Sequence, residues 1–148
     1  MSAAIAIITL GVADIARATA FYEAIGFRRS AALSRPSISF FAAGGTVLAL
    51  YGHGALAEDA GLPAEPRAPF GGITLARTLP SREAVDAAFA TALAAGATAL
   101  KDPHDAFWGG YSSYVADPDG HPIEIAWNPF ITLRPDGSLE LPPDPPAA

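Results

Sequence analysis

Cysteine is absent from the 148 residues, and lysine and methionine each occur once. Without cysteine the chain can have no disulfide, no thiolate nucleophile and no cysteine-bound metal. Nine cationic side chains, all arginine except Lys101, face fifteen carboxylates, so the formal net charge is −6. No stretch of the sequence concentrates these cations into the basic patch that a phosphate backbone requires, and we expect no nucleic-acid partner.

Long apolar runs are also missing. The first apolar run, residues 3–10, is short, has no basic segment before it and is interrupted by Thr9 and Gly11. It predicts neither a signal peptide nor a membrane span, so no membrane partner is expected. A cytoplasmic protein is the default expectation, although a chain without cysteine is compatible with any compartment.

What the sequence does contain is a series of short strand patterns interrupted by two helices. Apolar or alternating runs predict strands over residues 3–10, 27–33, 37–42 and 46–51, from residue 72, and over about 97–101, 111–116 and 121–127. Asp14 and Ser81 are favourable N-caps for helices over about 15–25 and 82–95. The second helix is expected to bury Val85, Phe89, Ala92 and Leu93 on one stripe.

The order of these elements repeats. A strand, a helix and three strands occur over about 4–52, a Gly- and Pro-rich linker covers 53–70, and the same order returns over about 71–128. Such self-similarity predicts two tandem βαβββ modules that pack as a pair, which is an α+β fold with mixed sheets in a single domain over 1–128. Residues 129–148 form a C-terminal extension with a small hairpin predicted around Pro135-Asp136-Gly137 and a proline-rich end that we expect to be partly disordered.

Two segments carry a family resemblance. They are FYEAIGF at residues 21–27 and DPDGHPIEIAWNP at residues 117–129. Together with the paired modules they resemble the vicinal oxygen chelate superfamily, which includes glyoxalase I, extradiol dioxygenases, fosfomycin-resistance enzymes and bleomycin-binding proteins. The resemblance covers about residues 4–128 and implies two curved sheets, each a half-barrel, and a homodimer. It does not identify a reaction, because one fold supports many functions.

The resemblance also implies four metal-ligand positions, on the first and last strands of each module. Carried over by position they fall on Ile7, Ala49, Gly72 and Glu124. Zinc needs about four ligands and magnesium about six, and three of these four residues supply no side-chain donor. We therefore expect no metal and no other cofactor, as in the bleomycin-binding branch of the superfamily.

Glu124 is the one carboxylate in an otherwise apolar strand. As a functional group it would be a desolvated carboxylate that acts as a general base or pairs with a cationic ligand. As a structural group it would be a buried Glu satisfied by an Arg or by backbone donors. In either case a partner is expected, such as a Tyr hydroxyl, an Arg or water, because buried Glu is rare without one.

Other candidate site residues lie on or near the predicted strands. Aromatic rings of Phe40, Tyr51, Trp108 and Tyr114 are expected to line a small-molecule cavity, with ordinary core packing as the alternative. Thr74 shares the face of Gly72, and Arg77 follows the fifth strand, where it would hold a ligand carboxylate or pair with an Asp. The segment Phe107–Gly110 is either a lid over this cavity or a plain surface loop.

The three histidines have no recognised ligand spacing. His53 or His104 would build an alternative metal or base site with Glu124, but exposed loop histidines are the simpler interpretation. His121 adjoins Gly120 and is read as a turn residue.

These observations favour a glyoxalase/bleomycin-resistance-like small-molecule-binding protein that lacks a complete metal site. One alternative is an enzyme of lyase, isomerase or dioxygenase type, with a rearranged or metal-free site built on Glu124. Another is a fold retained for assembly alone. The ligand itself is not identified by the sequence.

Overall fold

The computed structural model describes residues 2–66 and 68–147; Met1, Ala148 and Arg67, which falls in the predicted linker, lie outside the described residues. Each module contains the predicted elements in the predicted order. The first has β1 (Ile7–Val12), α1 (Ile15–Ala24), β2 (Arg28–Arg29), β3 (Ile38–Ala43) and β4 (Thr46–Gly52). The second has β5 (Leu75–Thr78), α3 (Arg82–Ala94), β6 (Thr98–Asp105), β7 (Tyr111–Ala116) and β8 (Pro122–Trp127).

The two sheets have the same topology. Their strand orders are β1-β4-β3-β2 and β5-β8-β7-β6. The first strand of each module is parallel to the last, and the remaining pairs are antiparallel. This repetition confirms the α+β fold of two βαβββ modules. It also leaves β1 and β5 as edge strands.

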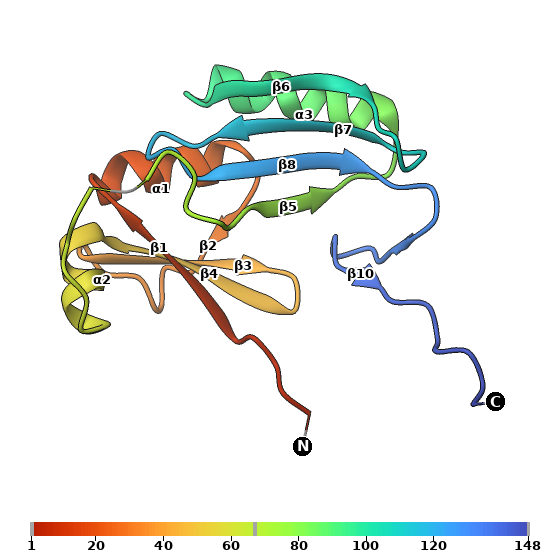
Figure 1. Cartoon of the computed structure of the whole chain (residues 1–148). Helices are drawn as coiled ribbons and strands as arrows, with labels where there is room; N and C mark the ends of the chain where they lie inside the picture. The colour runs from red at the N-terminus through yellow and green to blue at the C-terminus, as the bar shows by residue number, and fades with distance from the viewer. Residues whose placement is uncertain (1, 67, 148) are drawn as a thin grey trace.

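Two further pieces flank the modules. Helix α2 (His53–Asp59) opens the linker, and strands β9 (Thr132–Leu133) and β10 (Leu139–Glu140) form the hairpin predicted around Pro135-Asp136-Gly137. Figure 1 shows this hairpin beside the turn that joins β3 to β4, where Cβ of Ser138 lies 3.4 Å from the position of a Cβ on Gly44. No helix among the described residues is long and apolar enough to cross a membrane.

Several element boundaries differ from the sequence prediction. Strand β1 begins at Ile7 and continues through Gly11, because it pairs residue by residue with β4 as far as Val12. Strand β2 is reduced to the two residues that pair with β3. Leu93 was expected in the core but is 38% exposed, since the buried positions of α3 are Val85, Phe89 and Ala92.

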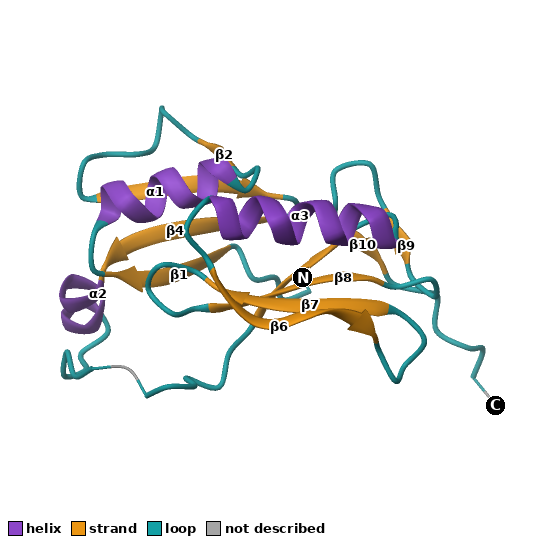
Figure 2. Cartoon of the chain, turned by 90° about the horizontal axis from the view of Figure 1, so that it is seen from above, coloured by secondary structure: helices purple, strands orange, loops and turns teal. Residues whose placement is uncertain are grey.

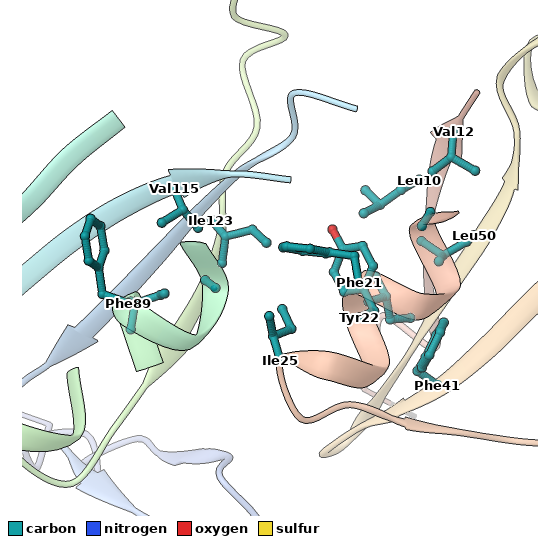
Figure 3. Close-up of a cluster of buried hydrophobic side chains, with 14 of the residues drawn as sticks. Leu10, Val12, Phe21, Tyr22, Ile25, Phe41, Leu50, Phe89, Val115 and Ile123 are labelled. Carbon is teal, nitrogen blue, oxygen red and sulfur yellow. The ribbon is translucent and has the colours of Figure 1, made fainter. Parts of the chain in front are cut away.

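One continuous core joins the two modules. In Figure 2 helices α1 and α3 lie end to end on one side of the sheets. Figure 3 shows Phe21 and Ile25 of α1 between Phe89 and Ile123 of the second module and Phe41 of the first. Neither sheet is therefore covered by its own helix alone, which explains why the modules form one unit.

The turn at residues 117–121 locks the modules together. The Asp117 carboxylate is buried and accepts hydrogen bonds from the Tyr22 hydroxyl at 2.7 Å and the His121 backbone N–H at 2.8 Å. Asp119 accepts a bond from the Ala13 N–H at 2.8 Å. His121 was expected to be a simple turn residue, but it is only 8% exposed and its Nε2 lies 2.9 Å from the Gly11 carbonyl oxygen. The turn is thus an inter-module contact as well as a hairpin connection.

Candidate functional site

Glu124 lies on the face of the second sheet that points away from the helices. Its neighbours in β8, Ile123 and Ile125, belong to the core, so alternation places the Glu124 side chain on the opposite face. Tyr114 of β7 and Ala76 of β5 are its direct partners in register. We call this surface the outer face of the second sheet.

Three polar groups meet on this outer face. Ser112 Oγ donates a hydrogen bond of 2.7 Å to Glu124 Oε2. Burial, the charge of Glu124 and a hydrogen bond to that carboxylate raise the pKa of Tyr114. The Ser112 hydroxyl therefore donates to the carboxylate, and the Tyr114 hydroxyl lies close to it. We refer to Ser112, Tyr114 and Glu124 as the Glu124 cluster.

The hydrogen-bond partner of Glu124 is Ser112, with Tyr114 beside it. A Tyr hydroxyl was one of the expected partners, and Ser112 was not foreseen. Its position two residues before Tyr114 in the same strand is the signal that would have revealed it, because residues i and i+2 share a face. No Arg is among the hydrogen-bond or ion-pair partners of Glu124 in the described residues.

The corresponding face of the first sheet is apolar. Thr9 pairs in register with Ala49, and Ala49 with Phe40, so these residues share one face. Tyr51 lies on the same side, two residues beyond Ala49. Ile7, at the start of β1, is 51% exposed on this side. The predicted aromatic residues Phe40 and Tyr51 thus lie on a different sheet from Tyr114 and Glu124.

The residues at the metal positions do not fit a metal. Glu124 is the only one of the four with a side-chain donor, and Ala49 is fully buried. The described residues contain no group of three or more His, Asp or Glu side chains that could hold an ion. A divalent ion would therefore find one carboxylate here, where it requires several ligands.

The register also changes one of the four positions. Ala76 pairs with Glu124 in the second sheet as Thr9 pairs with Ala49 in the first. Thr74 lies two residues before Ala76, as Ile7 lies two residues before Thr9, so Thr74 is the counterpart of Ile7. Gly72 lies one strand repeat further out, before β5 begins, with φ of 82°. The sequence did not reveal this difference, because β5 is shorter than β1 and no residue pattern marks where β5 begins.

Trp108 packs within its own loop. A Cβ on Gly110 would lie 1.9 Å from the Trp108 ring and 2.5 Å from the Trp127 carbonyl oxygen. The loop is closed by a hydrogen bond from the Ala106 N–H to the Gly110 carbonyl at 2.9 Å. The absence of a side chain at Gly110 therefore leaves the space in which the Trp108 ring packs. Phe107, the residue before Trp108, is fully exposed.

His53 and His104 bond to nearby backbone. His53 Nε2 lies 3.0 Å from the Glu65 carbonyl oxygen, next to α2, and His104 Nδ1 lies 2.9 Å from the Asp102 carbonyl oxygen. No hydrogen bond among the described residues links either ring to Glu124. The alternative site built from a His and Glu124 gains no support from this geometry.

Arg77 occupies a separate cleft. It pairs in register with the core residue Ile125, so it points to the side opposite Glu124. A cleft of about 840 Å³ contains Arg77 and Thr74 but none of the Glu124 cluster, Phe40, Tyr51 or Trp108. The lining of this cleft therefore does not combine the predicted aromatic rings with Glu124.

Comparison with known proteins extends this description. The family model of the Glyoxalase/Bleomycin resistance protein/Dioxygenase superfamily matches residues 4–125. None of the curated proteins compared matches the chain.

Similar solved structures come from several bacteria. A glyoxalase-related enzyme from Fulvimarina pelagi is 34% identical, with a TM-score of 0.85, over 93% of this chain and 97% of that chain. A glyoxalase/bleomycin resistance protein/dioxygenase family enzyme from Burkholderia phytofirmans PsJN is 25% identical, with a TM-score of 0.77, over 84% and 98%. A lactoylglutathione lyase from Agrobacterium tumefaciens is 22% identical, with a TM-score of 0.60 over 86% and 95%, and shows the fold alone.

The matched segment includes both βαβββ modules and ends one residue after Glu124, and the repeated sheet topology agrees with it. The chain therefore belongs to the Glyoxalase/Bleomycin resistance protein/Dioxygenase superfamily.

Proposed function

We propose that the protein binds a small cationic molecule at the Glu124 cluster without the help of a metal ion. The observation that carries the proposal is a single half-buried carboxylate that accepts a 2.7 Å hydrogen bond from Ser112 and lies directly beside the Tyr114 ring. The bond from Ser112 holds the carboxylate in place, and a fixed carboxylate suits the recognition of a cation.

The surroundings of the carboxylate favour a ligand with an aromatic or apolar body. Tyr114 lies directly beside Glu124 in register and offers a ring to which a cation is also attracted. Ala76 on the other side is small and leaves space. The net charge of −6 further favours the approach of a cation. A protonated amine joined to an aromatic ring combines these features.

The absence of a metal is part of the proposal. Among the positions inferred from the family, Glu124 supplies the one carboxylate, and Thr74, which the register puts in place of Gly72, adds only a hydroxyl. An enzyme that uses a metal would require ligands from elsewhere, and an enzyme without a metal would require Glu124 to accept a proton.

A second copy of the chain would complete the site. The outer face of the second sheet and the apolar face of the first sheet belong to different sheets, and Glu124, Tyr114, Phe40 and Tyr51 are only partly buried in one chain. Ile5 and Ile7 near the edge strand β1 are 69% and 51% exposed, and Ile73 before β5 is 68% exposed. We propose a cytoplasmic homodimer in which the first module of one copy covers the Glu124 cluster of the other.

A fragment titration tests the proposed ligand class. The probe is 2-phenylethylamine, and its neutral analogue is 2-phenylethanol. Amide chemical shifts of the chelator-treated protein should change with the amine at Ser112, Tyr114 and Glu124, and saturate in the millimolar range expected of a fragment. Glu124→Gln should weaken the amine about tenfold, which is about 1.4 kcal/mol, and leave the alcohol unchanged.

Glu140→Gln is the matched control, because Glu140 is exposed in β10 and its loss changes the net charge equally. Equal binding of amine and alcohol would contradict the proposal. So would equal loss of binding in the Glu140 control, which would indicate a general charge effect.

A further inference from the structure

A second cavity lies on the other side of strand β5. Residues 74–80 of β5 and the segment after it form one wall, and residues 42–48 at the β3–β4 turn form another. The β9–β10 hairpin closes a third side with residues 133–137, which Figure 1 shows opposite that turn. Its volume of about 840 Å³ is within the range of small-molecule sites. We call it the inter-module cleft.

The cleft has apolar walls and two positive groups: Arg77, which is half-buried, and Arg134 of the hairpin, which is exposed and donates to the Leu139 carbonyl. Ile8, Phe27, Leu75 and Leu79 supply aliphatic and aromatic surface from both modules. The guanidinium of Arg77 lies 5.5 Å from the centre of the Phe27 ring and donates a 3.0 Å hydrogen bond to the Ile25 carbonyl. The charge is thus fixed in place by the two modules rather than freely mobile in solvent.

Arg77 lacks a counter-ion in the described structure. The two ion pairs found among the described residues are Arg17 with Asp119 and Arg82 with Asp105. Burial lowers the pKa of Arg77, which shows that its charge is partly desolvated. A half-buried cation without a carboxylate partner is unusual, because desolvation of a charge is normally offset by pairing.

The one carboxylate in the cleft is otherwise engaged. Asp136 accepts bonds from the Ser138 N–H at 2.9 Å and the Ser138 hydroxyl at 2.6 Å, and these bonds lower the pKa of Asp136. It belongs to the hairpin turn and stays exposed to solvent. It places a negative charge at the cleft wall, which disfavours a ligand with two negative charges.

We propose that the inter-module cleft binds a monoanionic amphiphile, a carboxylate joined to an apolar chain or ring, with the carboxylate on Arg77. The apolar body would lie against Ile8, Leu75 and Leu79. A carboxylate matches the planar guanidinium and supplies the missing counter-ion. This site is independent of the Glu124 cluster, because Arg77 and Glu124 project from opposite faces of the same sheet.

Decanoate is the test ligand, and decanol, with the same chain and no charge, is its control. Calorimetric titration of the full chain should give one decanoate per chain, with decanol at least tenfold weaker. Arg77→Gln, which removes the positive charge, should reduce the affinity for decanoate to the affinity for decanol. Arg77→Lys should restore the preference for decanoate, and Arg28→Gln, at an exposed arginine in β2, should have no effect.

Amide chemical shifts of the wild-type protein show where decanoate binds. They test the proposed site even if Arg77→Gln fails to fold. Decanoate should shift Ala43, Leu75, Arg77 and Leu133 and leave Ser112 and Tyr114 unchanged. Decanoate binding should also persist in Glu124→Gln, which separates this site from the proposed cation site. Failure of decanoate to bind, equal binding of decanol, or shifts confined to the Glu124 cluster would overturn the proposal.

Discussion

At the scale of single residues, Glu124 is defined by its polar neighbours. The Ser112 hydroxyl is 2.7 Å from Oε2, and Glu124 contributes to the raised pKa of Tyr114 beside it. Both residues come from β7, so the position of the carboxylate depends on the β7–β8 pairing. This dependence makes the state of Tyr114 a reporter on Glu124.

The titration of Tyr114 should respond to Glu124. Because burial and the neighbouring carboxylate raise the pKa of Tyr114, Glu124→Gln should move that pKa down toward the ordinary value of about 10. The measurement is the absorbance of tyrosinate between pH 8 and 12. The titration step that moves in Glu124→Gln should be absent in Tyr114→Phe. An unchanged tyrosine titration in Glu124→Gln would contradict the described bond.

The same shift has a consequence for stability. A tyrosine whose pKa is raised in the folded state stabilises the protein fully at pH values below the pKa that it has in the unfolded chain. This stabilisation is lost as the pH rises through the pKa of the folded state. The free energy of unfolding should therefore fall above about pH 10. Tyr114→Phe should show a shallower fall in urea titrations at several pH values. Tyr111, whose pKa is raised first by its hydrogen bond to Asp86, should account for part of the remaining fall.

Gly110 should not tolerate a side chain. Its Cβ would overlap the Trp108 ring at 1.9 Å and the Trp127 carbonyl at 2.5 Å, so Gly110→Ala should destabilise the protein by about 2 kcal/mol. Displacement of the ring should also change tryptophan fluorescence. Gly45→Ala is the matched control, because nothing lies within 4 Å of its Cβ position and its φ is not positive. Equal stability of the two variants would contradict the loop packing.

At the scale of elements, the turn at residues 117–121 has two tasks. It connects β7 to β8 and also bonds to β1 and α1 of the other module. The Asp117 carboxylate accepts from the Tyr22 hydroxyl and from the N–H groups of Asp119 and His121. The hairpin that carries Glu124 is thereby fixed relative to the first module.

Loss of the Asp117 carboxylate should be costly. Asp117→Ala leaves several buried donors without an acceptor and should lower the free energy of unfolding by about 3 kcal/mol. Asp14→Ala removes a carboxylate that caps α1 at an exposed position and should cost about 1 kcal/mol. Urea unfolding measures both. A smaller effect at Asp117 than at Asp14 would show that the turn does not hold the modules together.

Much of this arrangement was predictable from the sequence. Asp14 and Ser81 correctly mark the starts of α1 and α3, and the repeated element order gave the paired modules. The inter-module role of the turn was not predictable, because the partners of Asp117 and His121 are about a hundred residues away. Local turn chemistry explains the same residues equally well and conceals the tertiary contact.

The candidate site was predicted only in part. Alternation correctly placed Glu124 away from the core, and Tyr114 is its neighbour, but Arg77 lies on the other face. Phe40 and Tyr51 lie on a different sheet from Glu124, and the shared cavity stays a prediction, since strand alternation gives a side of a sheet but not which sheets converge.

At the scale of the whole molecule, the proposed homodimer can be tested at Ile7, which is 51% exposed in the edge strand β1. Sedimentation velocity should give a species of twice the chain mass of 15.2 kDa. Ile7→Glu should shift it to the monomer, because a charge at a buried interface is strongly unfavourable. Leu141→Glu, at a residue 78% exposed in the C-terminal extension, should leave the dimer intact. A wild-type monomer at micromolar concentration would contradict the proposed assembly.

Binding at the Glu124 cluster without a metal is the central claim, and a crystal structure of the protein, purified without chelator and grown with 2-phenylethylamine, tests it most directly. We predict electron density for the amine beside the Glu124 carboxylate, with its ring near Tyr114 and no metal signal in the anomalous map. A metal ion bound through Glu124, or density for the amine only at other positions, would contradict the account.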